Sequence, residues 1–181
     1  MTAIARIIGI LLLNMLATLG STGLLTAASG PAVDTNNSAQ AFQKLTTLAG
    51  RWEATGPMGK VTTTFELISG GSVLLERLEV PGKEAMVTAY HLDGNRLILD
   101  HYCMAGNQPR LQAKPFNAES NEIDFDFVSA QNLASPQAGH MHQLKLRFTS
   151  ADELAADWTW AENGQIGAGG HNVALAYHRV N

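Results

Sequence analysis

The sequence predicts an all-β protein, an up-and-down antiparallel barrel of about ten strands preceded by one short helix. From residue 61 onward, short segments rich in β-branched and aromatic residues recur at regular spacing and are separated by turn residues. The chain also spreads 17 Gly and 6 Pro along its length, which favours many short strands over a few long helices. Its 181 residues suffice for one domain with its own core.

The single predicted helix runs from Ser38, a residue type favoured at the N-cap, to Gly50, a residue type favoured at the C-cap. Ala41, Leu45 and Leu48 are spaced at i, i+4 and i+7, which places them on one helical face. Eight of the strands are given bounds, from β-branched or alternating apolar residues between turn signals. They span Val61–Leu67, Val73–Val80, Met86–Leu92, Arg96–Cys103, Ile123–Phe127, Leu144–Phe148, Leu154–Ala161 and Val173–Val180.

The first thirty residues have the three-part layout of a secretory signal. Arg6 and the amino terminus precede an apolar run, Ile7–Leu13, and the small residues Thr26–Gly30 offer a cleavage site. Polar residues and glycines within residues 14–23 interrupt the apolar stretch, which falls short of the roughly 18 residues that a spanning helix needs. We therefore expect a cleaved signal peptide over residues 1–28.

After cleavage we expect a disordered leader over residues 29–38 and one barrel domain over residues 39–181. The mature protein is then secreted or periplasmic in a bacterium and is not held at the membrane. Cys103 is the only cysteine, so no intramolecular disulfide can brace the domain. The formal net charge of −4, from 12 Lys+Arg against 16 Asp+Glu, argues against a nucleic-acid partner.

The motif Gly50-Arg51-Trp52, where the helix meets the first strand, resembles the opening of lipocalin-like (calycin) barrels. In those families a basic residue packs across the Trp ring and closes the barrel floor, and Arg179 is the matching candidate for contact with Trp52. The segment Tyr90–Arg110 (YHLDGNRLILDHYCMAGNQPR) is similar to a segment of secreted bacterial calycin-like domains of unknown function. The resemblance covers about residues 40–180 and implies a barrel with a cavity, without an established chemistry. A more distant resemblance is to the ten-stranded, haem-binding nitrobindin barrels.

The turn at Asp93-Gly94 allows the two faces of its hairpin to be predicted. A two-residue Asp-Gly turn would pair Leu92 with Asn95, and therefore Tyr90 with Leu97. One face then carries no formal charge and is expected to point into the barrel; it comprises Met86, Thr88, Tyr90, Leu97, Leu99, His101 and Cys103.

The leading hypothesis is that the barrel binds a small hydrophobic or amphipathic molecule in its cavity, because a cavity with apolar walls and a few polar groups is the usual form of such a site. The rim segment Met104–Arg110 adds two amides and a planar guanidinium suited to a carboxylate or phosphate. The alternative for this segment is a turn at Gly106-Asn107 with Arg110 in solvent. The predicted ligand-binding residues are Tyr90, His101, Cys103, Asn107, Gln108 and Arg110.

A second hypothesis is an enzyme that uses His101 with Cys103 or Asp100, since an imidazole beside a thiol can take its proton. The sequence offers no clear third group to orient the histidine. The alternative is a buried thiol and a histidine that is hydrogen-bonded to a hydroxyl group. A binding protein is therefore favoured over an enzyme, and no catalytic residue is nominated.

A third hypothesis is a haem or metal barrel. His140 and His142 are two residues apart, a spacing that metal sites use, and they are expected at the end of the core-facing strip formed by Leu144, Leu146 and Phe148, but no third ligand is evident. Haem would need an axial ligand such as His171 or His178, and His178 would point outward if Arg179 closes the floor. The sequence therefore predicts no cofactor and no metal.

Overall fold

The computed structural model describes residues 37–167 and 171–180. The predicted signal peptide and residues 29–36 of the predicted leader lie outside the described residues. Ser38, expected to end the leader, is instead the first residue of a helix.

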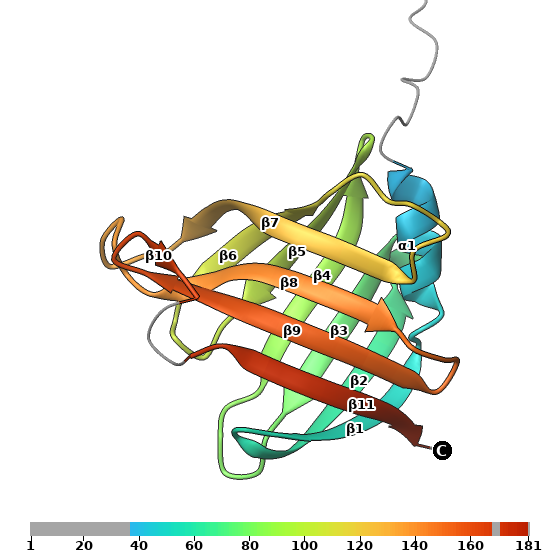
Figure 1. Ribbon diagram of the computed structural model, residues 1–181, viewed down its shortest axis with the longest axis horizontal. Coiled ribbons are helices and arrows are strands. Elements are labelled where there is room, and N and C mark those ends of the chain that lie inside the picture. The colour runs from blue at the N-terminus through green and yellow to red at the C-terminus, as the bar shows by residue number, and fades with distance from the viewer. Residues whose placement is uncertain (1–36, 168–170, 181) are drawn as a thin grey trace, which may run out of the picture. The chain divides into compact units, whose positions relative to one another are not determined.

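The chain forms one helix, α1 (Ser38–Thr46), a 3₁₀ turn at Ser69–Gly71, and a series of antiparallel strands (Figure 1). In chain order the strands are β1 (Gly50–Gly56), β2 (Gly59–Ile68), β3 (Val73–Glu79), β4 (Met86–Asp93), β5 (Arg96–Tyr102), β6 (Gln108–Ala113), β7 (Glu122–Gln131), β8 (His140–Phe148), β9 (Glu153–Glu162), β10 (Gln165–Ile166) and β11 (Val173–Val180).

The described strands close into a barrel. Each strand from β1 to β9 pairs with the next, β9 pairs with β11, and β11 returns to β1. The two-residue β10 pairs only with β9 and extends that hairpin. The predicted all-β, ten-stranded antiparallel barrel with one N-terminal helix is therefore confirmed.

The helix boundaries differ from the prediction at both ends. Asn37 occupies the N-cap, with a φ of 53°, and Ser38 is buried with its hydroxyl donating to the Asn95 carbonyl oxygen at 2.9 Å. Gly50 begins β1 instead of capping the helix, and its φ is 133°. A Cβ atom there would lie 2.8 Å from Nη1 of Arg179, so glycine suits both the backbone and the close approach.

The β4–β5 hairpin has the predicted faces but not the predicted register. Asp93 pairs with Arg96 across a Gly94-Asn95 loop, so Tyr90 pairs with Leu99 and not with Leu97. Gly94 has a φ of 60° at the first loop position, where type II′ turns place glycine. A shift of two residues returns each side chain to the same face, and the expected inward side chains from Met86 to His101 are all buried.

Strand β6 is not predicted by the sequence, which suggested a loop at the rim. Its sequence, QPRLQA, has weak β propensity and contains a proline. A β-bulge lies next to Pro109, between Arg110 and Leu111, where the ladder to β7 is interrupted. Burial alternates along the strand, with Pro109, Leu111 and Ala113 buried.

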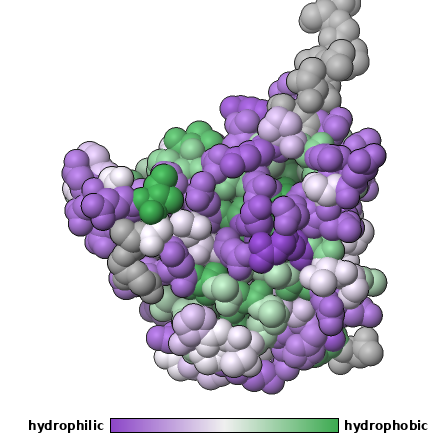
Figure 2. All heavy atoms as spheres, viewed as in Figure 1, coloured by the Kyte–Doolittle hydropathy of each residue, from purple (hydrophilic) through white to green (hydrophobic). Residues whose placement is uncertain are grey.

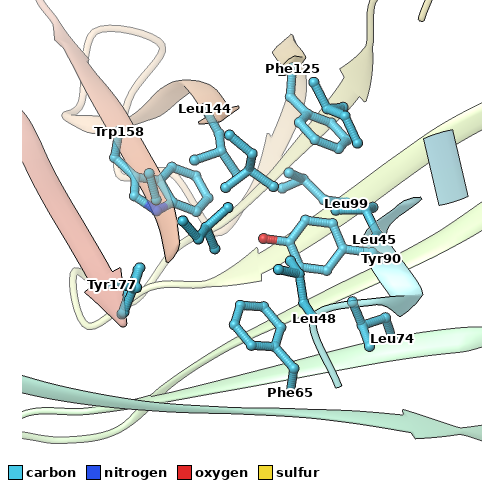
Figure 3. Close-up of a cluster of buried hydrophobic side chains, with 14 of the residues drawn as sticks. Leu45, Leu48, Phe65, Leu74, Tyr90, Leu99, Phe125, Leu144, Trp158 and Tyr177 are labelled. Carbon is cyan, nitrogen blue, oxygen red and sulfur yellow. The ribbon is translucent and has the colours of Figure 1, made fainter. Parts of the chain in front are cut away.

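The middle of the barrel is filled by side chains from all around the sheet. Figure 3 shows aromatic and leucine side chains pointing toward one another, among them Phe65, Tyr90, Phe125 and Trp158. The helix contributes Leu45, which is fully buried. The interior is therefore a packed core over most of its length.

Arg179 and Trp52 meet at the helical end of the barrel. The guanidinium carbon of Arg179 lies 4.3 Å from the centre of the Trp52 ring. Nη1 and Nη2 of Arg179 donate to the carbonyl oxygens of Ala49 at 2.8 Å and Thr47 at 2.9 Å. These bonds join the last strand to the chain just after α1, where helix carbonyl groups lack partners of their own.

Candidate functional site

A pocket of about 310 Å³ opens at the end of the barrel opposite α1, the end at which Figure 1 places β10. The β1–β2 and β5–β6 turns and the first residues of β4, β8 and β11 surround it. The lining is mainly apolar and consists of Pro57, Met58, Met86, Cys103, Met104, Ala105, Met141, Trp160, His171, Asn172 and Val173. We call this space the mouth pocket.

Every sulfur-containing side chain of the described residues lines the mouth pocket. They are Met58 in the β1–β2 turn, Met86 in β4, Met104 and Cys103 after β5, and Met141 in β8. Methionine is flexible and polarizable, so it adapts its shape to apolar ligands. Four elements that are distant in sequence thus supply one soft, adaptable surface.

A smaller void of about 20 Å³ adjoins the mouth pocket on its inner side. Three methionines, Met58, Met86 and Met141, border both spaces. Val173 also borders both spaces. The other side chains that border the smaller void do not line the mouth pocket; they are Leu78, His101, Trp158 and Leu175. We call this space the inner void.

His101 belongs to a buried row of polar side chains on the inner face of β3, β4 and β5. Glu76 pairs with Thr88, and Thr88 pairs with His101. Nδ1 of His101 lies 2.9 Å from the Thr88 hydroxyl oxygen, and Thr88 also hydrogen-bonds to Glu76. The Tyr90 hydroxyl donates to Oε2 of Glu76 at 2.8 Å. The ring of His101 packs against Trp158 with centroids 4.8 Å apart.

Burial shifts both titratable ends of this row toward their neutral forms. It lowers the pKa of His101 to about 4. It raises the pKa of Glu76 to about 7, although hydrogen bonds from Tyr90 and Thr88 act in the opposite direction. No described Lys or Arg forms an ion pair with Glu76, which is only 5% exposed.

Four of the predicted site residues are at least partly buried, but they do not all border one space. Tyr90 and His101 are interior, and Cys103 lies at the mouth two residues further along the chain. Asn107 is buried in the β5–β6 turn, where Nδ2 donates to the Gly139 carbonyl oxygen at 2.9 Å. Tyr90 bonds Glu76 within the core and does not line the mouth pocket.

Gln108 and Arg110 do not point into the barrel. They alternate with the buried residues of β6 and lie on its outer face. Arg110 forms a bidentate ion pair with Asp100, with Nε–Oδ1 at 2.7 Å and Nη2–Oδ2 at 2.9 Å. Although burial raises the pKa of Asp100, hydrogen bonds from Arg110 and His91 hold it below its usual value. The expectation that Arg110 binds a ligand carboxylate is therefore replaced by a surface ion pair.

The geometry provides no activated thiol. Burial raises the pKa of Cys103, against backbone hydrogen bonds from Ala105 and Met104, so the reactive thiolate is disfavoured. His101 is hydrogen-bonded to Thr88 and not to the thiol. Asp100, the other acid considered for catalysis, lies on the outer face.

His140 and His142 are displaced by a β-bulge between Met141 and Gln143. Their rings contact each other, with His140 Nε2 3.1 Å from His142 Nδ1, and both pack on Phe127. The bulge brings Met141 to the mouth pocket in their place. Within residues 37–167 and 171–180 there is no cluster of three His, Cys, Asp or Glu side chains suited to a metal ion.

The two proposed haem ligands lie in different places. His178 is exposed on the outer face of β11, next to buried Tyr177. His171 is exposed at the mouth, with its ring centroid 5.5 Å from that of Trp160. Neither ring lies in the packed interior.

Sequence reasoning placed Met86 on the inward face and Met104 at the rim, but it missed Glu76 and the convergence of the four methionines on one pocket. Glu76 lies on the buried face of β3 with Leu74 and Leu78. The signal that could have identified it was a single acidic residue in a row of apolar residues at every second position. The convergence of the methionines had no local signal, because they come from four separate elements.

On the outer face over β7, β8 and β9, Figure 2 shows hydrophilic residues gathered at the centre of the view, with hydrophobic residues beside them. A hollow of about 340 Å³ lies there, bordered by charged side chains that pair with one another, including Lys145 with Asp124 and Arg147 with Asp157. Among the described residues no helix is long and apolar enough to cross a membrane.

Comparison with known proteins finds matches among solved structures. The crystal structure of Rv2717c from M. tuberculosis superposes with a TM-score of 0.52 and 17% sequence identity, covering 78% of this chain and 98% of that chain. The likeness is one of fold. No family model and no curated protein matches the sequence.

Proposed function

We propose that this chain is an exported β-barrel that binds a small, largely apolar molecule in the mouth pocket. The observation that carries the proposal is the pocket itself, about 310 Å³ in volume and lined by methionine, tryptophan, proline and valine side chains. Ligand pockets usually measure about 300–1,000 Å³ and combine apolar walls with a few polar groups. The ligand is therefore small, and it binds at the mouth because the middle of the barrel is packed.

The lining provides few polar groups with which to orient the ligand. Cys103, His171 and Asn172 supply a thiol, an imidazole and an amide at the rim. No Lys, Arg, Asp or Glu borders the pocket among the described residues. These features support a neutral or weakly polar ligand over a strongly charged one.

The binding site can be tested with N-phenyl-1-naphthylamine, a neutral probe whose fluorescence rises in apolar surroundings. Val173→Trp places a large ring in the pocket, whereas Ala174→Trp places the same ring on the exposed outer face of the same strand. We expect the wild type and Ala174→Trp to bind the probe equally and Val173→Trp to bind it at least tenfold more weakly. Equal binding by all three proteins would place the probe elsewhere and overturn the proposal.

Export can be tested by expressing all 181 residues in a bacterial host and measuring intact masses of the periplasmic protein. Cleavage near residue 28 predicts a mature chain recovered from the periplasm. Native and denatured spectra of the same sample then reveal any co-purified molecule by their mass difference. A full-length chain confined to the cytoplasm would contradict export.

A further inference from the structure

The inner void differs in chemistry from the mouth pocket above it. With a volume of about 20 Å³ it has room for one water-sized sphere, so an organic molecule does not fit. Its border contains three thioethers and one imidazole, and the remaining side chains are leucine, valine and tryptophan. No carboxylate and no hydroxyl group borders it among the described residues.

We propose that the inner void binds a single Cu(I) ion, held by Nε2 of His101 and by the thioether sulfurs of the three methionines that border the void. This inference does not rest on the proposed function, because the apolar molecule would occupy the mouth pocket. Thioether and imidazole ligands favour Cu(I), whereas Mg²⁺ and Ca²⁺ require oxygen ligands.

The hydrogen bond from His101 Nδ1 to Thr88 leaves the other ring nitrogen, Nε2, available to bind the ion. The Thr88 hydroxyl has one hydrogen, and it bonds both Glu76 and Nδ1 of His101. When that hydrogen is donated to the Glu76 carboxylate, Thr88 can only accept a hydrogen from Nδ1. The lone pair is then on Nε2, to which no described residue is hydrogen-bonded. Metal-binding histidines are commonly oriented by such a partner on the second nitrogen.

Charge gives an independent reason for a cation at this place. Glu76 is a buried carboxyl group with no described cationic partner, an arrangement that is unfavourable when the group is ionised. A monovalent cation bound to His101 would be linked to Glu76 through Thr88 and would balance its charge.

The surroundings of the void also suit a soft cation. Trp158 borders the void and packs on His101, so an aromatic ring of the kind that attracts cations lies beside the proposed site. Methionine has three rotatable side-chain bonds, so its sulfur can change direction by rotation of the side chain alone. The three methionines come from the β1–β2 turn, β4 and β8, and they therefore reach the void from separate parts of the barrel wall.

The test uses the mature protein titrated anaerobically with Cu(I) and ascorbate, in competition with the chelator bicinchoninate. We expect one ion per chain. Met58→Leu, Met86→Leu and Met141→Leu each remove a sulfur with little change in volume. Each should weaken Cu(I) binding at least tenfold.

Met104→Leu is the matched control, because Met104 lines only the mouth pocket. It should leave the Cu(I) affinity within twofold of the wild type, as should Cys103→Ser. The ε-methyl NMR signals of the three bordering methionines should shift on binding Ag(I), a redox-inert substitute. Circular dichroism of every variant verifies folding.

Three results would overturn the proposal. They are failure of the wild type to retain Cu(I) against the chelator, loss of binding in Cys103→Ser alone, and unchanged affinity in all three bordering methionine variants. Naphthylamine binding is measured separately on the same proteins. Loss of the Cu(I) site would therefore leave the proposed apolar site untouched, because that site is tested only by the naphthylamine probe.

Discussion

Replacing Glu76 with glutamine should stabilise the protein above neutral pH. The Glu76 side chain is 5% exposed, and burial raises its pKa to about 7 from the ordinary 4.5. Each unit by which the pKa in the folded state differs from the pKa in the unfolded state changes the free energy of unfolding by about 1.4 kcal/mol. The ionised carboxylate therefore costs the folded state about 3 kcal/mol above pH 7. Glutamine keeps an oxygen that can accept the Tyr90 hydroxyl hydrogen and removes the charge.

The sign of the pH dependence follows from which state binds more protons. Between pH 4.5 and pH 7 the folded protein keeps the Glu76 proton more often than the unfolded chain does, so stability falls as the pH rises through this range. The tyrosines that face Glu76, Tyr90 and Tyr177, keep their protons here because burial raises their pKa values further. His101, whose pKa burial lowers to about 4, is present in both proteins, and its contribution cancels in the difference.

The assay is urea unfolding of the metal-free wild type and Glu76→Gln from pH 5 to pH 8. The variant's advantage in the free energy of unfolding should grow from below about 1 kcal/mol at pH 5 to about 3 kcal/mol at pH 8. Glu66→Gln, which changes an exposed glutamate on β2, is the control and should show no such trend. Parallel pH curves for wild type and Glu76→Gln would refute the reasoning.

Two further predictions concern opposite ends of the barrel. Arg179→Ala should lower the free energy of unfolding by about 2–3 kcal/mol, because it removes the hydrogen bonds to the carbonyl oxygens of Thr47, Ala49 and Ala151, the exposed ion pair with Asp152 and the contact with Trp52. Urea unfolding measures this change, and a loss below about 0.5 kcal/mol would show that the contact is only peripheral. Gly139→Ala should displace Trp160, since the added Cβ atom would lie 2.2 Å from Cζ2 of the ring, and should destabilise the protein by about 1–3 kcal/mol. Altered tryptophan emission and a lower Tm are the readouts, and wild-type values for both would contradict the clash.

The fold class could be predicted because alternation along a strand is a local property. In the β4–β5 hairpin the apolar and uncharged side chains recur at every second residue, and that period identifies the inward face whatever the turn. The face stayed correct although the loop is Gly94-Asn95 and not Asp93-Gly94. His101 and Cys103 were accordingly both assigned to the inward face, and the structure has His101 in the interior and Cys103 at the mouth.

The rest of the candidate site depends on pairings that local patterns do not encode. Arg110 was expected at a rim loop, but its segment pairs with β5 and β7 as a strand, which directs the side chain outward to Asp100. In β8 a bulge interrupts the alternation, so Met141 lines the mouth where two histidines were expected. A bulge and a register shift result from contacts with the neighbouring strand.

By itself, the sequence determined the barrel class and the inward face of the central hairpin, and its resemblance to lipocalin-like barrels suggested the contact between Arg179 and Trp52. Only the tertiary structure decided that four methionines and Cys103 line one pocket, and that Glu76 lies behind His101. The physical reason is distance along the chain. Periodicity reports which side of a strand is buried, whereas barrel closure and strand register decide which buried side chains meet.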